Sequence, residues 1–224
     1  MPAAPAKLAA LRHLLAERFP VAPRLPGRTL FTGMAALDDA AGGLPLGALT
    51  EIVCAAPSCG SQLLLAQLLA ATRATRTRVA LVDAADSFDP ASFPGDLLAH
   101  LVWVRCTAAT LSAQASATAG ALAAADLLTR DANLGLVVLD LRHADERELR
   151  RTPSTFWYRL QRAVEPADLA LVVITPRATV PSAQLRFSLN ASHPAAALEL
   201  ERPALSTALA PTLQRQRQRL QSIA

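Results

Sequence analysis

One stretch of the sequence has the residue types of a phosphate-binding loop. An apolar run from Leu49 to Val53 leads into residues 55–60 (AAPSCG), and a helical pattern follows from Ser61 to Arg73. Strand–loop–helix units of this kind bind phosphate through backbone N–H groups and the positive end of the helix dipole. The spacing therefore predicts a loop with the geometry of a phosphate site between this strand and this helix.

The predicted loop lacks the side chains that make such a loop catalytic. A working loop reads G-x-x-x-x-G-K-[ST], in which the lysine contacts the β- and γ-phosphates and the hydroxyl contacts Mg²⁺. Gly60 matches the last glycine, but Ser61 stands at the lysine position, and Lys7 is the only lysine of the chain. The degenerate positions of the loop are Ala55, Pro57, Ser58, Gly60, Ser61 and Gln62. Phosphoryl transfer needs concentrated positive charge and a held metal, so we expect a non-enzymatic protein with no catalytic residue, no metal and no cofactor.

Two alternative interpretations have a ligand bound in this loop. The backbone amides alone can bind a nucleotide or another anion weakly. An atypical ATPase is the second alternative, in which an arginine such as Arg73 or Arg142 takes the place of the missing lysine. Turnover of ATP by the pure protein would decide between an atypical ATPase and an inactive fold.

Predicted strands and helices alternate through the middle of the chain. The predicted strands are 49–53, 78–83, 101–105, 136–140 and 169–174, and the predicted helices are 61–73, 89–99, 112–129 and 153–164. The strands are continuous apolar runs, which is typical of a parallel sheet covered by helices on both faces. Residues 184–189 and 196–200 are predicted as antiparallel strands at the sheet edge. The sequence thus predicts an α/β fold.

The chain divides into three parts. Residues 1–27 contain an amphipathic helix over 5–19 and a proline-rich linker, residues 28–204 form the core, and residues 205–224 form an arginine- and glutamine-rich tail that we expect to be a mobile extension. The residues proposed to bind partners are Leu8, Leu11 and Leu15 of the helix and Arg215, Arg217 and Arg219 of the tail. The alternatives are that the helix packs on its own domain and that the tail is a solvated run of charge.

Composition limits the class of protein. The 224 residues are 52% apolar and 4% aromatic, with a formal charge of +4. This length and apolar content suit one α/β domain, and the few aromatics argue against a stacking channel for single-stranded nucleic acid. Direct DNA contact through arginines is therefore expected to be weak. Three cysteines suggest buried thiols rather than a disulfide framework. Without a signal peptide or a membrane-length apolar run, a cytoplasmic protein is expected, with no membrane partner.

Five segments resemble the ATPase core of the RecA family. Residues 31–38 (FTGMAALD), 42–47 (GGLPLG) and 50–53 (TEIV) follow the order of that family's entry to its phosphate loop. Residues 82–90 (VDAADSFDP) are similar to its D-A-E-x-x-x-D-P segment, and residues 183–188 (AQLRFS) to its late edge strand. The resemblance implies a RecA-like P-loop NTPase core with a mostly parallel central sheet.

The departures from that family concern its catalytic residues. The resemblance places Asp83 and Asp140 at strand-end acids of the family, and it places Ala85 where the family has the glutamate that activates water. Asp140 corresponds to the Walker B acid, and its simpler interpretation is a strand-end acid or a helix cap. The two segments that match the DNA-contacting loops are short (142–151 and 176–182), so a recombinase filament is not expected.

Within the RecA-related proteins, the chain resembles the ImuA-type accessory proteins of bacterial mutagenic translesion synthesis. That resemblance implies a place in the DNA-damage (SOS) response. The implied partners are an inactive Y-family polymerase homologue, an error-prone replicative-type polymerase and RecA itself. A SulA-like inhibitor of cell division is the alternative within the same fold.

Overall fold

The central element of the fold is a seven-stranded sheet. In this computed structural model, which describes residues 28–56, 58–107, 116–190 and 195–217, the strand order is β5-β4-β6-β7-β3-β8-β9. The first six strands in this order are parallel, and only the pairing of β8 with β9 is antiparallel. The strands are β3 (Ala48–Val53), β4 (Val79–Asp83), β5 (Leu101–Arg105), β6 (Leu136–Asp140), β7 (Ala170–Thr175), β8 (Leu185–Ser188) and β9 (Thr212–Gln216).

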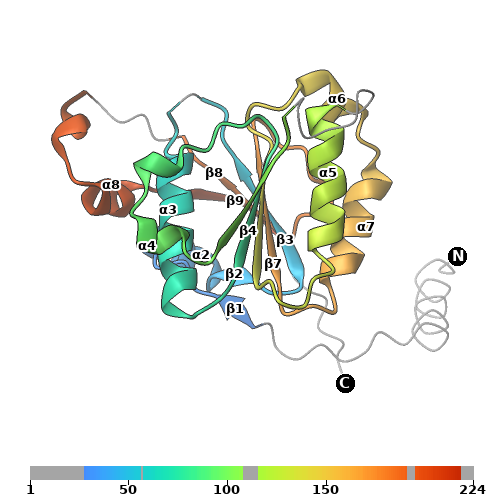
Figure 1. Ribbon diagram of the computed structural model, residues 1–224, viewed down its shortest axis with the longest axis horizontal. Coiled ribbons are helices and arrows are strands. Elements are labelled where there is room, and N and C mark those ends of the chain that lie inside the picture. The colour runs from blue at the N-terminus through green and yellow to red at the C-terminus, as the bar shows by residue number, and fades with distance from the viewer. Residues whose placement is uncertain (1–27, 57, 108–115, 191–194, 218–224) are drawn as a thin grey trace, which may run out of the picture.

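Helices cover both faces of this sheet (Figure 1). One face carries α2 (Ala35–Ala41), α3 (Ser61–Ala74), α4 (Gly95–Leu98) and α8 (Arg202–Ala208), and the other carries α5 (Ala117–Leu128), α6 (Glu146–Arg151) and α7 (Ser154–Val164). Short 3-10 turns occupy Pro90–Ser92 and Ala195–Glu199, and a small two-stranded sheet joins β1 (Thr29–Leu30) to β2 (Leu44–Pro45). The molecule is thus a three-layer α/β structure.

The sheet is buried on both sides, as its apolar strands predict. Every residue of β3, β4, β6 and β7 is buried. Side chains of each strand alternate between two apolar clusters, one under α3 and one under α5 and α7. Each fully buried Leu, Val or Phe side chain contributes about 1.5–3 kcal/mol relative to an exposed one. These two clusters hold the carboxyl ends of the strands in a fixed register.

Four sequence predictions need correction. Residues 196–200 are not a strand: most of them belong to a 3-10 turn. The antiparallel partner of β8 is instead β9, so residues 212–216 belong to the sheet and are not a mobile extension, and β8 itself is parallel to β3. The predicted helix over 89–99 is divided because Pro94 lies between the 3-10 turn and α4.

The polar sequence of β9 is typical of a solvent-exposed tail rather than of a strand. Its residues alternate between exposed and half-buried, with Leu213 packed on the apolar cluster beneath α3. An edge strand needs only one inward apolar side chain, and charge on such a strand discourages pairing with other chains. The predicted helix over residues 5–19 lies outside the described residues.

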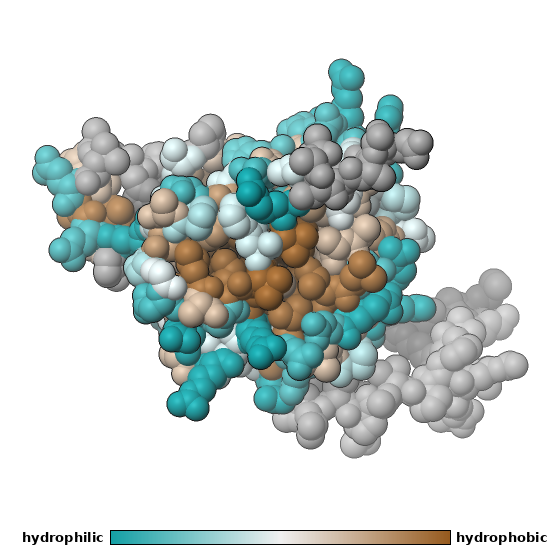
Figure 2. All heavy atoms as spheres, viewed as in Figure 1, coloured by the Kyte–Doolittle hydropathy of each residue, from teal (hydrophilic) through white to brown (hydrophobic). Residues whose placement is uncertain are grey.

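The surface in Figure 2 shows an apolar area in the middle of the view. It lies between α3 and α4 on one side and α5 on the other, where polar side chains cover most of the surrounding surface. Within the described ranges, no helix is both long enough and apolar enough to span a bilayer. Those ranges also hold no group of three or more His, Cys, Asp or Glu side chains placed to bind a metal ion.

Candidate phosphate-loop site

The degenerate loop lies at the carboxyl ends of the parallel strands. β3 leads into the loop and then into α3, while β4 and β6 end beside each other with Asp83 in register with Asp140. The chain leaves β4 toward α4 on one face and leaves β6 toward α6 on the other. Ligands of open α/β sheets bind at such a reversal, outside the carboxyl ends of the strands. The fold therefore places the loop where a ligand site is expected.

The backbone of the loop retains a tight turn into α3. Gly60, the residue before the helix, has φ 89°, and Ser58 has φ 57°. Ser61 is the first residue of α3 and is only 6% exposed, while the Oε1 atom of Gln62 is buried with no hydrogen-bond donor among the described residues. Ala55 is exposed, and Pro57 lies outside the described residues. The loop keeps its bend but offers no lysine.

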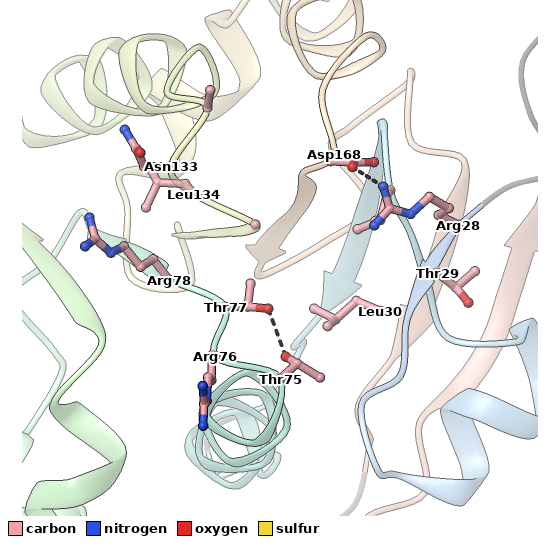
Figure 3. Close-up of a pocket in the computed structure, with 13 residues that line it drawn as sticks. Arg28, Thr29, Leu30, Thr75, Arg76, Thr77, Arg78, Asn133, Leu134 and Asp168 are labelled. Carbon is pink, nitrogen blue, oxygen red and sulfur yellow. Dashed lines mark hydrogen bonds and ion pairs between the residues drawn. The ribbon is translucent and has the colours of Figure 1, made fainter.

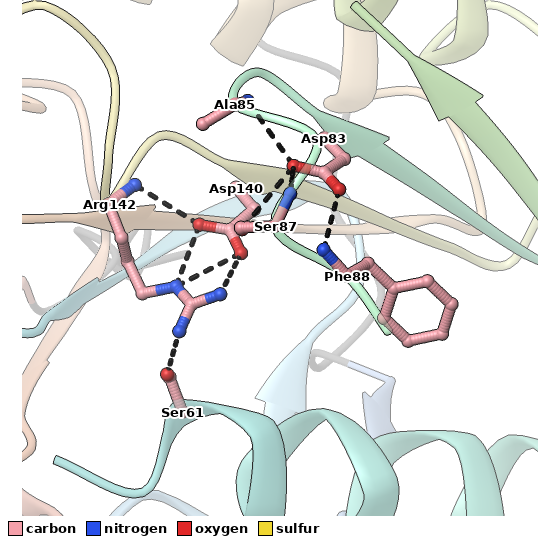
Figure 4. Close-up of polar contacts among 7 residues, drawn as sticks. All are labelled: Ser61, Asp83, Ala85, Ser87, Phe88, Asp140 and Arg142. Atoms are coloured by element: carbon pink, nitrogen blue, oxygen red, sulfur yellow. Dashed lines mark hydrogen bonds and ion pairs between the residues drawn. The ribbon is translucent and has the colours of Figure 1, made fainter. Parts of the chain in front are cut away.

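A cation nevertheless reaches this loop from the end of β6, which is separated from β3 by β7. Arg142 follows β6, and its guanidinium lies between Asp140 and Ser61 (Figure 4). Its Nε donates to Asp140 Oδ1 at 2.9 Å and to Oδ2 at 3.0 Å, its Nη2 donates to Oδ2 at 2.5 Å, and its Nη1 donates to Ser61 Oγ. The side chains of Arg142 and Asp140 are 11% and 6% exposed. The guanidinium therefore bridges the aspartate that ends β6 and the first residue of α3.

This bridge is an electrostatically satisfied unit. Burial lowers the pKa of Arg142, but its hydrogen bonds and charge interaction with Asp140 outweigh burial and raise the pKa above its ordinary value. A charged, bidentate pair of this kind is among the stronger hydrogen-bonded contacts. By contrast, Arg73 lies in the last turn of α3, about 18 Å along the helix from Ser61. Of the two arginines proposed to replace lysine, only Arg142 is at the loop.

Asp83 and Ala85 belong to the end of β4 and the turn that follows it. The buried carboxylate of Asp83 accepts hydrogen bonds from the backbone N–H groups of Ala85 (3.3 Å), Ser87 (3.1 Å) and Phe88 (2.9 Å) (Figure 4). Through these hydrogen bonds the carboxylate binds the backbone of the turn that follows β4. Ala85 is exposed and carries no group that could activate water. Asp83 thus shapes the turn.

Two cysteines of the loop form a hydrogen-bonded pair that the sequence analysis did not identify. Cys54 and Cys59 are buried free thiols at the two ends of the loop. The Cys54 thiol donates to Cys59, which raises the pKa of Cys54 and lowers the pKa of Cys59. Hydrogen bonds from Ser61 and the charge of Arg142 lower the pKa of Cys59 further, against the effect of its burial, to about 6. All three cysteines are buried, as predicted.

We expect the Cys59 thiolate to be detectable by its ultraviolet absorbance. The native protein should gain about one thiolate as pH rises through about 6, well below the ordinary pKa of 9.0, because its ionised sulfur keeps the hydrogen bond from Cys54. Cys54→Ala should move this titration to higher pH, and Cys106→Ala should leave it unchanged. A first thiolate that appears only near the ordinary pKa would contradict the expectation.

The predicted partner-binding residues are only partly described. Leu8, Leu11, Leu15 and Arg219 lie outside the described residues. Arg215 lies in β9 opposite Arg186, and burial together with the charges of Arg217 and Arg186 lowers its pKa. The backbone N–H of Arg217 donates to Gln184 O at 2.8 Å. Arg215 and Arg217 are therefore at a sheet edge, on the far side of β3 from Arg142.

A cavity of about 400 Å³ lies at the opposite end of the sheet (Figure 3). It is lined by residues at the amino ends of β4 and β6, including Arg76, Arg78 and Asn133, and by the exposed ion pair of Arg28 with Asp168. These charged groups are exposed and do not converge on one point in Figure 3. We therefore place the candidate site at the phosphate loop.

No protein-family model matches this sequence, and no curated protein matches it. Function is therefore inferred from the residues of the site. The sequence did contain a signal for the Arg142 contact, because an arginine two residues after a strand-end aspartate can fold back on that carboxylate. Its contact with Ser61, 81 residues earlier, depends on the sheet order.

Proposed function

We propose that this chain is a RecA-like pseudo-ATPase that acts by binding other proteins in DNA-damage-induced translesion synthesis. The observation that supports the proposal most directly is the guanidinium of Arg142 held between Asp140 and Ser61. The guanidinium of Arg142 and the carboxylate of Asp140 form an ion pair that occupies the space beside the loop. The guanidinium also neutralises the carboxylate that an NTPase uses to hold its metal.

The energetics of this pair argue against turnover. To contact a γ-phosphate, the guanidinium would have to leave Asp140, which would then be a buried carboxylate without its cation. Breaking a buried ion pair costs about 3–5 kcal/mol. With Ala85 at the position where the family has its glutamate, a bound nucleotide would lack the group that the family uses to activate water. The site is consistent with a fold that binds other proteins rather than catalysing a reaction.

The proposed partners follow from the resemblance to ImuA-type proteins. They are an inactive Y-family polymerase homologue, an error-prone replicative-type polymerase and RecA, in the bacterial cytoplasm. A SulA-like inhibitor of cell division is the second candidate within the same binding role. The contacts proposed for these partners are the helix around Leu8, Leu11 and Leu15 and the arginines at 215, 217 and 219.

Calorimetry and a turnover assay with ATP and Mg²⁺ test the loss of catalysis. We expect no hydrolysis above the background rate, and at most weak binding. The atypical ATPase is the competing function, and the position of Arg142 at Ser61 is the observation in its favour. Metal-dependent turnover that disappears in Asp140→Ala would establish the ATPase and contradict the proposal.

Pull-down assays with RecA and the two polymerases test the binding role. Deleting residues 1–25 removes the proposed helix. Deleting 205–224 would also remove β9, so the tail is better tested by Arg217→Ala combined with Arg219→Ala. Binding to none of these partners by the intact chain would contradict the proposed function. Unchanged binding by both variants would contradict only the proposed contacts.

A further inference from the structure

The outer side of β9 is an open edge of the sheet. Among the described residues β9 pairs only with β8. The helix nearest to it, α2, contacts the face that carries α3, because Leu213 packs against the cluster that contains Leu37 of α2. Thr212, Gln214 and Gln216 are exposed. The N–H and C=O groups along the outer side of β9 can therefore pair with an added strand.

The opposite face of this edge is basic. Arg215 lies opposite Arg186 in the ladder. Arg217 directly follows β9, and residues two apart in a strand share a face, so its side chain lies on the same side as that of Arg215. Burial lowers the pKa of Arg215, and the charges of Arg217 and Arg186 lower it further. Of these three guanidinium groups, only that of Arg186 has a carboxylate partner among the described residues, the buried Glu51. The other two attract an anionic partner.

Helix α7 adds an aromatic side chain beside these arginines. Tyr158 is 45% exposed and lies within electrostatic range of Arg215. Neither α7 nor β9 contains an acidic residue. Arginine and tyrosine are enriched among the side chains that contribute most of the binding energy in protein interfaces. The face therefore has the composition of a surface that binds an acidic protein.

An acidic segment for this edge has to come from a different protein. The parts of this chain outside the described residues contain one acidic residue, Glu17. A second copy of this chain would bring the arginines of two β9 strands together, and like charges across a ladder destabilise it. A single strand of nucleic acid would match the arginines, but its phosphates only accept hydrogen bonds. The edge of β9 offers donors and acceptors alike, and an extended peptide uses both.

We propose that β9 is the docking edge for an extended acidic segment of a partner protein, which adds to the sheet as a further strand with its carboxylates against Arg215 and Arg217. The inference rests on the proposed protein-binding function and assigns the chemistry of the partner's segment. Alternate residues of an added strand share one face, so a segment with acidic residues at every second position fits the arginines best. The charge that repels basic strands from this edge thus makes the pairing selective for an acidic one.

A fluorescent peptide of alternating threonine and glutamate, about eight residues long, tests this edge. We expect fluorescence anisotropy to show that the intact chain binds it at low ionic strength and that added salt weakens the binding, because salt screens exposed charges. Arg215→Ala and Arg217→Ala should each weaken binding about two- to five-fold, as for the loss of one pair of opposite charges across a ladder. Arg147→Ala removes an exposed arginine of α6; it is the matched control and should leave binding unchanged.

Hydrogen exchange distinguishes an added strand from contact through side chains alone. The amides of β9 should become protected when the peptide binds. Absence of binding, binding without this protection, binding that neither arginine variant weakens, or equal binding of a threonine–lysine peptide would overturn the proposal. Tighter binding of an oligothymidylate through the same arginines would assign the face to nucleic acid and would also overturn it. Circular dichroism checks folding, and Arg217→Ala, at an exposed side chain, keeps the test valid if Arg215→Ala unfolds.

The pull-down assays fail independently of this test. If the chain binds the glutamate peptide but captures neither RecA nor the polymerases, the proposed partners are wrong and the docking edge remains. If it captures a partner but does not bind the peptide, the proposed function remains and the docking edge is wrong.

Discussion

Replacing Glu51 with alanine should lower the free energy of unfolding by about 3–5 kcal/mol, since removing one partner of a buried ion pair leaves the other without compensation. Glu51 lies in β3 and is fully buried. Its Oε2 accepts a hydrogen bond from Arg186 Nε at 2.6 Å, and Arg186 is itself only 16% exposed. Loss of the carboxylate therefore leaves a guanidinium with little access to water.

The same carboxylate also fixes the segment after β7. Its Oε1 accepts from Thr175 Oγ1 at 3.0 Å and from the backbone N–H groups of Thr179 and Val180, the latter at 3.0 Å. Each buried donor left without an acceptor costs about 1–3 kcal/mol, although such costs do not add simply. Glu51→Gln keeps an acceptor and loses the charge, so we expect its destabilisation to be smaller than that of Glu51→Ala.

Chemical denaturation provides the measurement for Glu51. The matched control is Glu146→Ala, which removes an exposed carboxylate paired with Arg150 and Arg177. Exposed ion pairs contribute about 0–1 kcal/mol, so this variant should unfold close to the unchanged protein. If Glu51→Ala and Glu146→Ala both changed the free energy of unfolding only slightly and by the same amount, the buried pair of Glu51 with Arg186 would not stabilise the fold.

Asp140→Ala is the second change with a large expected effect. It leaves the guanidinium of Arg142, 11% exposed, with only the Ser61 hydroxyl as a described hydrogen-bond acceptor. We again expect a loss of about 3–5 kcal/mol in the free energy of unfolding. Arg142→Met should also destabilise, because it leaves Asp140 buried without its cation. The double variant Asp140→Ala/Arg142→Met should be more stable than either single change, since neither charge is then left buried without its partner.

A double-mutant cycle on denaturant curves measures the coupling between Asp140 and Arg142. The control is the exposed pair of Asp86 with Arg105, where Asp86→Ala should lower the free energy of unfolding far less than Asp140→Ala does, because water screens an exposed pair. Additive effects of Asp140→Ala and Arg142→Met would show that the pair is not coupled. Such a result would also remove the main support for a phosphate site filled by the chain's own arginine.

The alternation of strands and helices was readable from the sequence alone. Five continuous apolar runs predicted β3, β4, β5, β6 and β7 nearly residue by residue. Burial on both faces explains the apolar runs of β3, β4, β6 and β7, whereas β5 lies at the sheet edge and is only partly buried. The parallel sheet and the missing lysine at Ser61 were likewise evident from residue types and spacing. Local composition determines these features, so no tertiary information was needed.

The C-terminal edge and the contacts of the site depended on tertiary structure. Thr212–Gln216 is too polar to be recognised as a strand, and it becomes β9 only because β8 offers an unpaired edge beside it. The contacts of Arg142 with Ser61 and of Glu51 with Arg186 join residues 81 and 135 positions apart. The order in which the strands lie brings such residues together, and that order results from the packing of two apolar clusters rather than from any local pattern.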